Sequence, residues 1–305
     1  MNNEYHIIGL MSGTSLDGLD IVKCRFQKHK NWSYKIEKCH TITYSNYWTS
    51  KLRNLHTKSG KDIAKANIEY GALLGNITSE YIQTHNLKCD YIASHGHTIL
   101  HRPDLGYTLQ IGDGATISNI TNITTINNFR ELDLSLGGQG APLTPIFHKL
   151  LKSQFKFKEV TFVNIGGIVN TTTVLNNGNM SGTDIGPGMC LIDRWIRQES
   201  KKNYDENGTM AQSGKVNKIA LDQLLKNFYE KENILNNEAI QSFDTKYFDF
   251  SFVKHLSPED GTATLTEFTA HIIISALKKK ERNKEKIILC GGGRKNNFLV
   301  KKLQK

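Results

Sequence analysis

Three glycine-rich turns, each at the end of a strand-like run, limit what this chain can fold into. The first lies within "GLMSGTSLDGLD" (9–20), between two apolar runs that each have the length of a strand. The second is Gly166 and Gly167 in "VTFVNIGGIVNTTTVL", which repeats the strand, turn and strand of the opening. The third, at 291–293, separates "KIILC" from the start of a helical pattern. Strands that alternate with helices in this way favour an α/β fold.

Turns of this composition suit the binding of phosphate groups. Glycine adopts positive φ and lets a ligand approach the backbone, and successive amide groups in such turns can surround an anion. In the first turn Thr14 and Ser15 add hydroxyl donors, and Asp17 or Asp20 can hold Mg²⁺, which prefers oxygen ligands. Any one of these turns is more simply a tight hairpin, but three together favour a phosphate site. The chain contains neither GxxxxGK[ST] nor a GxGxxG that opens a helix, which argues against P-loop and Rossmann folds.

The length and the spacing of apolar residues predict two domains. With 305 residues the chain has room for two cores. Apolar residues recur at helical spacing over 61–87, 215–229 and 262–280, which predicts three long helices. The stretch "LGGQGAPLTP" (136–145) is dense in glycine and proline and marks a boundary or hinge. We therefore expect an N-terminal domain at 1–135 and a C-terminal domain at 136–305.

Composition excludes several classes of protein. The five cysteines are far apart and form no CxxC pair, which argues against a zinc site or a disulfide framework and suits a reducing, cytoplasmic environment. No apolar run approaches the length of a membrane span, and the N-terminus lacks the features of a signal peptide. The 39 Lys and Arg against 29 Asp and Glu give a net charge of +10, but no aromatic residues are interleaved with the C-terminal lysines. A solvated basic surface therefore explains the charge better than nucleic acid or membrane binding.

Nine motifs resemble those of one family and occur in the same order. They are "GLMSGTSLDGLD", "SHGHTILHRP", "TLQIGDGA", "LGGQGAPLTP", "NIGGIVNTT", "GTDIGPGMCLIDRW", "YDENGTMAQSGKV", "DGTATLTEFTA" and "CGGGRKNN". Together they resemble the anhydro-N-acetylmuramic acid kinases, over nearly the whole chain. The resemblance implies two α/β domains of the actin/hexokinase/Hsp70-like (ribonuclease H-like) fold with a central nucleotide cleft, shortened at the C-terminus relative to the family.

The resemblance also implies a reaction. The family uses ATP and water to open the anhydro bridge of 1,6-anhydro-N-acetylmuramic acid and to phosphorylate O6, which yields N-acetylmuramic acid 6-phosphate in cell-wall recycling. The implied cofactors are ATP and Mg²⁺, with magnesium held by Asp17 or Asp20, and the implied assembly is a homodimer. Neither nucleic acid nor a membrane is an expected partner.

Site residues carried over from the family fall on both predicted domains. Asp184, in "GTDIGPG", corresponds to the catalytic aspartate that takes a proton from water, and we expect it on a glycine-rich turn. The predicted ATP-binding residues are Gly13, Thr14, Ser15, Leu16, Asp17, Gly18, Leu19, Asp20, Gly166, Gly167, Gly291, Gly292, Gly293 and Asn296. The predicted substrate-binding residues are His95, His97, Thr98, Gln110, Arg130, Gly138 and Gln139.

Other interpretations of these residues stay open. Asp184 can instead cap a turn, and Asp193 can form a surface salt bridge. A metal site at the histidines of "SHGHTILH" is less favoured, because we expect Gly96 to interrupt the strand there. The family usually carries other residues at His97, Asn128, Ile185 and Met189. An inactive relative, or a sugar- or nucleotide-binding protein on the same fold, is therefore the alternative to an active kinase.

Overall fold

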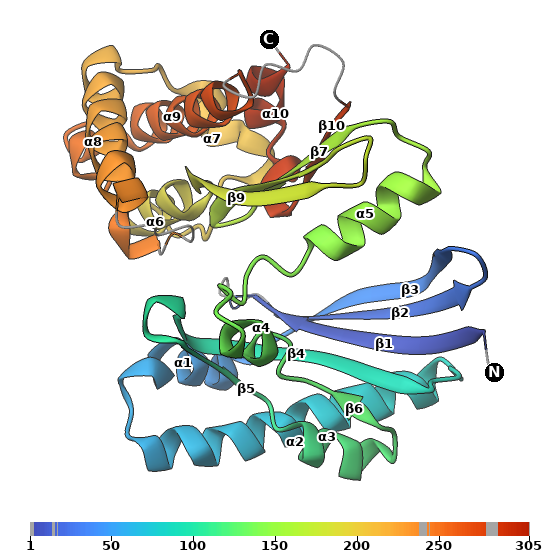
Figure 1. Ribbon diagram of the computed structural model, residues 1–305. Helices are drawn as coiled ribbons and strands as arrows, with labels where there is room; N and C mark the ends of the chain where they lie inside the picture. The colour runs from blue at the N-terminus through green and yellow to red at the C-terminus, as the bar shows by residue number, and fades with distance from the viewer. Residues whose placement is uncertain are drawn as a thin grey trace. The chain divides into compact units, whose positions relative to one another are not determined.

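The computed structural model describes residues 3–13, 16, 18–237, 243, 245–278 and 286–304 (Figure 1). Contacts within the chain divide it into two units, Met1–Leu143 and Thr144–Lys305. The division falls inside the glycine- and proline-rich stretch at 136–145, and the assignment of a function to each domain stays a prediction. In the part of the chain that the structure describes, no helix combines the length and the apolar composition needed to cross a bilayer.

The first unit is built on a mixed sheet in the order β3-β2-β1-β4-β5, with β6 also paired to β4. β1, β2 and β3 run antiparallel in sequence, whereas β4 lies parallel to β1. The strands are β1 (Glu4–Ser12), β2 (Gly18–Lys28), β3 (Trp32–Thr43), β4 (Tyr91–Arg102), β5 (Tyr107–Ile111) and β6 (Thr125–Ile126). The helices are α1 (Asn46–Asn54), α2 (Gly60–Thr84), α3 (Gly114–Thr121) and α4 (Glu131–Ser135).

The long helix α2 supplies much of the first core, and its prediction from sequence is confirmed. Ser59 caps its N-terminus by accepting a hydrogen bond from the Asp62 amide at 3.2 Å. Tyr70 and Leu74, one helical turn apart, are buried in the same apolar cluster as Ile8 of β1. The helix therefore packs against the strand that leads into the first glycine-rich turn.

The second unit repeats the strand order of the first. Its sheet runs β10-β7-β8-β9, with β7, β8 and β9 antiparallel in sequence and β10 parallel to β7. The strands are β7 (Val160–Ile165), β8 (Ile168–Val174), β9 (Met180–Pro187) and β10 (Lys286–Cys290). The helices are α5 (Pro145–Gln154), α6 (Cys190–Glu199), α7 (Thr209–Ser213), α8 (Lys218–Asn237), α9 (Pro258–Lys278) and α10 (Asn297–Leu303). Two mixed sheets of like topology, each with helices, agree with the predicted fold class.

Helices pack on both faces of the second sheet. On one face Phe162 stacks on His148 of α5, with ring centroids 4.1 Å apart and planes within 7°. The opposite face carries Val163 and Ile165, which belong to the larger core around the buried Trp195 of α6. Successive side chains of β7 point to opposite faces of the sheet, so Phe162 and its neighbour Val163 belong to two separate apolar clusters.

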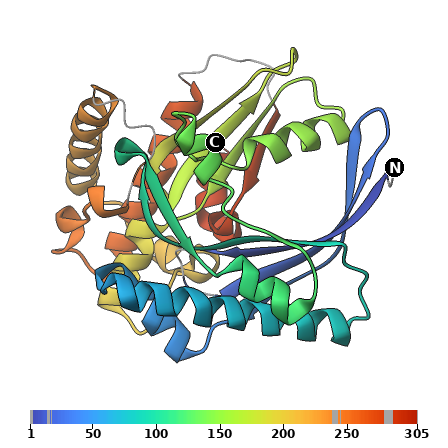
Figure 2. The same ribbon diagram turned by 60° about the horizontal axis from the view of Figure 1, so that its bottom comes forward.

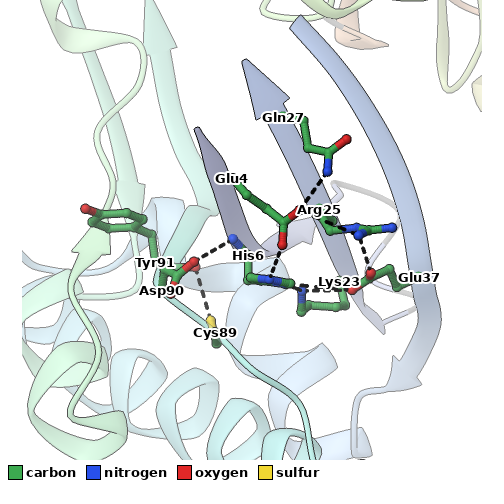
Figure 3. A network of polar contacts seen from close by, with 9 residues as sticks. All are labelled: Glu4, His6, Lys23, Arg25, Gln27, Glu37, Cys89, Asp90 and Tyr91. Carbon is green, nitrogen blue, oxygen red and sulfur yellow. Dashed lines mark hydrogen bonds and ion pairs between the residues drawn. The ribbon is translucent and has the colours of Figure 1, made fainter. Parts of the chain in front are cut away.

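A network of charged side chains lies across β1, β2 and β3 (Figure 3). Its centre is Lys23, only 1% exposed, whose Nζ donates to Glu37 Oε2 at 3.0 Å and to His6 Nδ1 at 2.9 Å. Because His6 Nδ1 accepts from an ammonium group, its Nε2 carries the proton and donates to Glu4 Oε1 at 3.1 Å. Arg25 Nε lies 3.2 Å from the other oxygen of Glu37. Glu37 is thus the carboxylate that faces both a buried ammonium and a guanidinium.

We expect Glu37→Gln to lower the free energy of unfolding by about 1–3 kcal/mol, because it leaves the buried Lys23 ammonium without its carboxylate. This range is below that of a fully buried pair, since the Glu37 side chain is 30% exposed. Urea unfolding measures the change. The double variant Lys23→Met/Glu37→Gln removes both charges and should recover most of the loss. Equal stability of Glu37→Gln and the unmodified protein would show that the pair contributes nothing.

The ion pair of Lys23 and Glu37 also predicts that the free energy of unfolding depends on pH. The hydrogen bond from Lys23, with the charges of Lys23 and Arg25, holds the pKa of Glu37 below its ordinary value of 4.5, against the opposing effect of burial. A carboxyl whose pKa is lower in the folded state stabilises the fold above its unfolded pKa and loses that contribution as the pH falls through the folded pKa. The stability difference between the unmodified protein and Glu37→Gln should therefore shrink when urea unfolding is repeated at decreasing pH below about 4.5.

Candidate functional site

The first predicted phosphate turn joins β1 to β2 in the first unit. Leu16, in the left-handed region with φ of 59°, donates its amide to Gly13 O at 3.3 Å, which closes the turn. At Gly18 an added Cβ would lie 2.5 Å from the carbonyl oxygen of Ile42, so a larger residue would force the strands apart. The side chain of Asp20 accepts a hydrogen bond from Thr41 Oγ1 at 2.5 Å, and that of Leu19 is buried in the core.

Three residues of this turn, Thr14, Ser15 and Asp17, lie outside the described residues. Their assignment to ATP and Mg²⁺ stays a prediction. Among the residues that the structure does describe, no three His, Cys, Asp or Glu side chains are arranged to hold a metal ion.

The second and third turns follow neighbouring parallel strands of the second unit. Gly166 and Gly167 come directly after β7, and residues 291–293 come directly after β10. Because Cys290 is in register with Asn164 of β7, both turns lie at the same edge of this sheet. Ligands of open α/β sheets bind at such carboxyl ends of parallel strands.

Close packing explains the glycines of the third turn. Gly291 has φ of 81°, and a Cβ there would lie 2.6 Å from both Asn164 Oδ1 and Ile165 O. A Cβ on Gly293 would lie 2.3 Å from Ile165 Cγ2, whereas Gly292 has open space beside it. Asn296 caps α10 by accepting the Leu299 amide at 2.9 Å. Its Nδ2 is buried and has no hydrogen-bond partner among the described residues.

The second turn is tied to the start of α6. The carbonyl oxygens of Gly166 and Gly167 accept amides of the segment that opens this helix, at 2.9 Å from Met189, 2.8 Å from Gly188 and 3.2 Å from Cys190. These bonds fix the turn relative to β9 and α6. They also engage the two carbonyl oxygens, whose partial negative charge would otherwise repel a phosphate group.

Asp184 lies on a strand, so its predicted place on a turn is wrong. It belongs to β9, an antiparallel strand in which it is in register with Asn170 of β8. Its Oδ2 accepts the backbone amide of Phe243 at 2.8 Å, and the residue is half-buried. The neighbouring Ile185 is buried in the core, and Met189 packs against the same cluster. Both departures from the family pattern are thus apolar side chains in an apolar setting.

Asp193, the other carboxyl of the "GTDIGPGMCLIDRW" motif, lies on α6. Burial raises the pKa of its carboxyl to about 6, the Asp205 charge adds to this rise, and Arg197 opposes it. Asp193 Oδ1 is buried without a hydrogen-bond partner in the described part of the chain. Asp205 is itself engaged, since it accepts the amides of Met210 at 2.8 Å and Ala211 at 3.0 Å. Asp193 thus lacks, at Oδ1, a hydrogen bond like the one that orients Asp184, which makes it the weaker candidate for the base.

In the first unit, β4 carries the predicted sugar-side histidines. The strand continues through Gly96 to Arg102, so the expectation that Gly96 ends it is wrong. Gly96 instead has φ of +70°, and an added Cβ would lie 2.4 Å from Ile111 O. This distortion gives the histidines on either side of Gly96 different partners.

His95 binds Arg130. Its Nδ1 donates to Gly96 O at 3.0 Å, so its Nε2 is the acceptor, and it receives Arg130 Nη2 at 2.9 Å and Nε at 3.2 Å. Burial, and then the Arg130 charge, lower the pKa of His95, which keeps the ring neutral. Arg130 Nη1 donates to Gly140 O at 2.7 Å. Among the described residues, Arg130 therefore binds a neutral ring and a carbonyl group but no carboxylate.

His97 belongs to a chain of buried polar groups that sequence reasoning missed. Its Nδ1 lies 3.0 Å from Ser12 Oγ, Ser12 bonds Tyr70, and the Tyr70 and Tyr44 hydroxyls lie 2.5 Å apart. Burial lowers the pKa of His97 to about 4, with a smaller effect from His95, so the ring is neutral at pH 7. Ser12 directly precedes the first glycine of the phosphate turn, which was the available signal. Tyr44 and Tyr70 carry no such signal, because they have the spacing of ordinary core residues.

The remaining sugar-side residues lie nearby in the same unit. Gln110 Nε2 donates to Thr108 Oγ1 at 2.7 Å and lies 3.4 Å from Thr98 Oγ1. The loop that contains Gly138 and Gln139 is held to α4, since the Gly138 amide donates to Asp133 O at 2.8 Å. The structure therefore brings His95 and Arg130 into contact, links His97 to Ser12, and places Thr98 and Gln110 on the paired strands β4 and β5.

Comparison with known proteins decides the family. The family model of anhydro-N-acetylmuramic acid kinase matches residues 5–305. The anhydro-N-acetylmuramic acid kinase of Pelagibacter ubique is 40% identical over 321 residues, which cover 100% of this chain and 84% of that protein. This chain belongs to the anhydro-N-acetylmuramic acid kinase family.

More distant comparisons agree with this assignment. The anhydro-N-acetylmuramic acid kinase of Pseudomonas syringae is 33% identical over 313 residues, which cover 98% of this chain and 83% of that protein. Among solved structures, the activator of the 2-hydroxyisocaproyl-CoA dehydratase from Clostridium difficile with bound ADPNP covers 99% of this chain and 84% of its own. At 14% identity and a TM-score of 0.41, that likeness adds nothing to the family assignment.

Proposed function

We propose that this member of the anhydro-N-acetylmuramic acid kinase family converts 1,6-anhydro-N-acetylmuramic acid, ATP and water into N-acetylmuramic acid 6-phosphate and ADP, as a step of peptidoglycan recycling in the cytoplasm. The observation that carries the proposal is the family match over residues 5–305. By its motif, "GTDIGPG", Asp184 is the residue that we assign to the family's catalytic aspartate. The family pattern also favours a homodimer.

Asp184 is the proposed general base. It takes a proton from water, the water oxygen bonds to the anomeric carbon, the bond from that carbon to O6 breaks, and O6 accepts the γ-phosphoryl group of ATP. The half-buried position of Asp184 and the amide of Phe243 at Oδ2 hold the carboxylate in one orientation.

Arg130 is the proposed partner of the substrate carboxylate. The guanidinium of Arg130 is half-buried and binds only neutral groups within the described residues. Burying a charge without a counter-charge costs free energy, and a bound anion offsets that cost. The substrate is a muramic acid derivative and carries one carboxylate. His95 orients the planar guanidinium through two nitrogens, which leaves the charge available for a planar anion.

The first two glycine turns are the proposed phosphate sites for ATP, and residues 291–293 are the proposed adenosine turn. The amides and close backbone approach of the first two turns suit phosphate oxygens, and Mg²⁺ supplies the charge that neutralises the transferred phosphoryl group. The carboxylate of Asp17 or Asp20 is a suitable oxygen donor for this metal, directly or through water.

We expect Mg-ATP to raise the melting temperature of the purified protein by several degrees at a concentration well above its dissociation constant, because it binds only the folded state. Thermal unfolding followed by fluorescence measures this shift. Gly13→Val should abolish it, since a branched side chain blocks backbone approach to phosphate. A folded protein whose melting temperature is unchanged by millimolar Mg-ATP would contradict a working nucleotide site.

The activity itself is tested by mass spectrometry of 1,6-anhydro-N-acetylmuramic acid incubated with ATP, Mg²⁺ and the protein. An active kinase yields a product heavier by one phosphate and one water. ATP-dependent thermal stabilisation without this product would favour the alternative, a nucleotide-binding relative that has lost catalysis.

A further inference from the structure

A hollow of about 380 Å³ lies on the second unit and is rich in lysine. Four lysines line it, and Phe157 and residues of the β8–β9 turn complete the lining. They are Lys149 and Lys152 of α5, and Lys156 and Lys158 of the loop that follows. A volume of this size matches that of sites for small molecules.

The hollow is separate from the phosphate turns. Phe157 lies just before β7 begins at Val160, whereas Gly166 and Gly167 lie just after β7 ends. A strand of this length spans about 20 Å, so the two places are at opposite ends of the sheet. Helix α5 packs along β8 and β9 (Figure 2), and Lys149 lies beside Gly178 of the β8–β9 turn.

The lysines converge, which an ordinary solvated helix face does not require. Lys149 and Lys152 are three residues apart on one side of α5, and Lys156 and Lys158 reach the same hollow from the loop after the helix. Across the hollow, a Cβ added to Gly178 would lie 3.9 Å from Nζ of Lys149. None of the ion pairs formed by the described residues includes any of the four lysines.

Cations interact favourably with the C-terminus of a helix, but this effect explains only part of the cluster of four lysines. It applies to Lys152, in the last turn of α5. It does not apply to Lys158, which follows the helix, or to the position of Lys149 over the β8–β9 turn. Four like charges around one hollow repel one another, and a bound anion removes that repulsion.

We propose that this hollow binds a small anion that carries at least two phosphate or carboxylate groups. One negative charge would leave most of the four ammonium charges uncompensated. Each ammonium offers three rotatable donors and suits the tetrahedral oxygens of a phosphate without a fixed geometry. The size and concave form of the hollow favour a free small molecule over a membrane surface or a nucleic acid.

Inorganic tripolyphosphate is the probe for this site. We compare the unmodified protein, Lys149→Gln/Lys158→Gln, and a control of equal charge loss, Lys201→Gln/Lys202→Gln, by isothermal titration calorimetry at low and physiological salt. The control lysines are exposed and lie away from the hollow. Each protein is also measured with Gly13→Val, which removes binding at the proposed ATP site. In that background we expect the hollow variant to bind tripolyphosphate about 10-fold more weakly than the control. Binding in both should weaken with salt.

Four results separate this site from other sources of binding. The hollow variant should keep the KM for Mg-ATP of the unmodified protein, because its lysines are outside the proposed catalytic site. Equal tripolyphosphate binding by the hollow variant and the control would overturn the proposal, as would binding that Gly13→Val abolishes completely. Sedimentation with phosphatidylglycerol vesicles that depends on Lys149 and Lys158, in a protein that does not bind tripolyphosphate, would assign the lysines to a membrane surface instead.

Discussion

Asp184→Asn is expected to lower turnover by about 10²- to 10⁴-fold while ATP binding survives. The larger end of this range is expected, because the proton that leaves the attacking water drives the opening of the anhydro ring. Asparagine keeps the size of the side chain, and its carbonyl oxygen can still accept the Phe243 amide that binds Asp184 at 2.8 Å. Only the ability to take a proton is removed. Product formation and the Mg-ATP melting shift should both be measured on the same preparation.

Asp193→Asn is the matched control for this experiment. Asp193 is not the residue that the family motif marks as the base, so we expect its replacement to change turnover far less. Near-normal turnover in Asp184→Asn, with a loss in Asp193→Asn, would assign the base to Asp193. Loss of both turnover and ATP binding in Asp184→Asn would indicate that Asp184 holds β9 in place and performs no chemistry.

Arg130→Gln is expected to raise KM for 1,6-anhydro-N-acetylmuramic acid by about 100-fold, with a smaller change in kcat. Loss of one partner of a buried charge pair costs about 2–5 kcal/mol, and a carboxylate remote from the reacting bonds is bound equally in the ground and transition states. Initial-rate kinetics at saturating Mg-ATP provide the measurement. Arg130→Lys should recover part of the loss, since it keeps the charge but cannot contact His95 through two nitrogens.

An uncharged substrate separates binding of the carboxylate from support of the fold. Arg130 also donates to Gly140 O, so its loss can loosen the loop at 136–143. The corresponding anhydro-sugar without a carboxylate, 1,6-anhydro-N-acetylglucosamine, should be a poor substrate that Arg130→Gln converts no more slowly than the unmodified protein does. An equal loss for both sugars would show that Arg130 acts through the loop and does not contact the carboxylate.

Elements with strong local signals could be predicted from the sequence. The long helix α2 has a serine cap and regular apolar spacing, and the β7–β8 hairpin has two apolar runs around Gly166 and Gly167. By contrast, β9 has the sequence "MSGTDIGP", rich in glycine and polar residues, and its strand conformation depends on pairing with β8. The sequence therefore identified Asp184 but misplaced it on a turn.

The contacts of the candidate site depend on distant pairing that local patterns do not encode. Ser12 meets His97 because β1 and β4 pair in parallel, although 85 residues separate the two side chains. The positive φ of Gly96 distorts β4, and because of this distortion His97 contacts Ser12 whereas His95 contacts Arg130. Helix α5 was missed for a different reason: its Pro145, a favourable first residue of a helix, was read as part of the boundary.

Each of the two units is one uninterrupted length of chain, and in the strands that the structure describes neither sheet borrows a strand from the other unit. This contiguity has a consequence for biosynthesis. Translation at about 5–20 residues per second needs roughly 10–30 s to add the residues that follow Leu143. During that interval the nascent first half already contains every strand of its own sheet, so it can fold on the ribosome before the second half has been made.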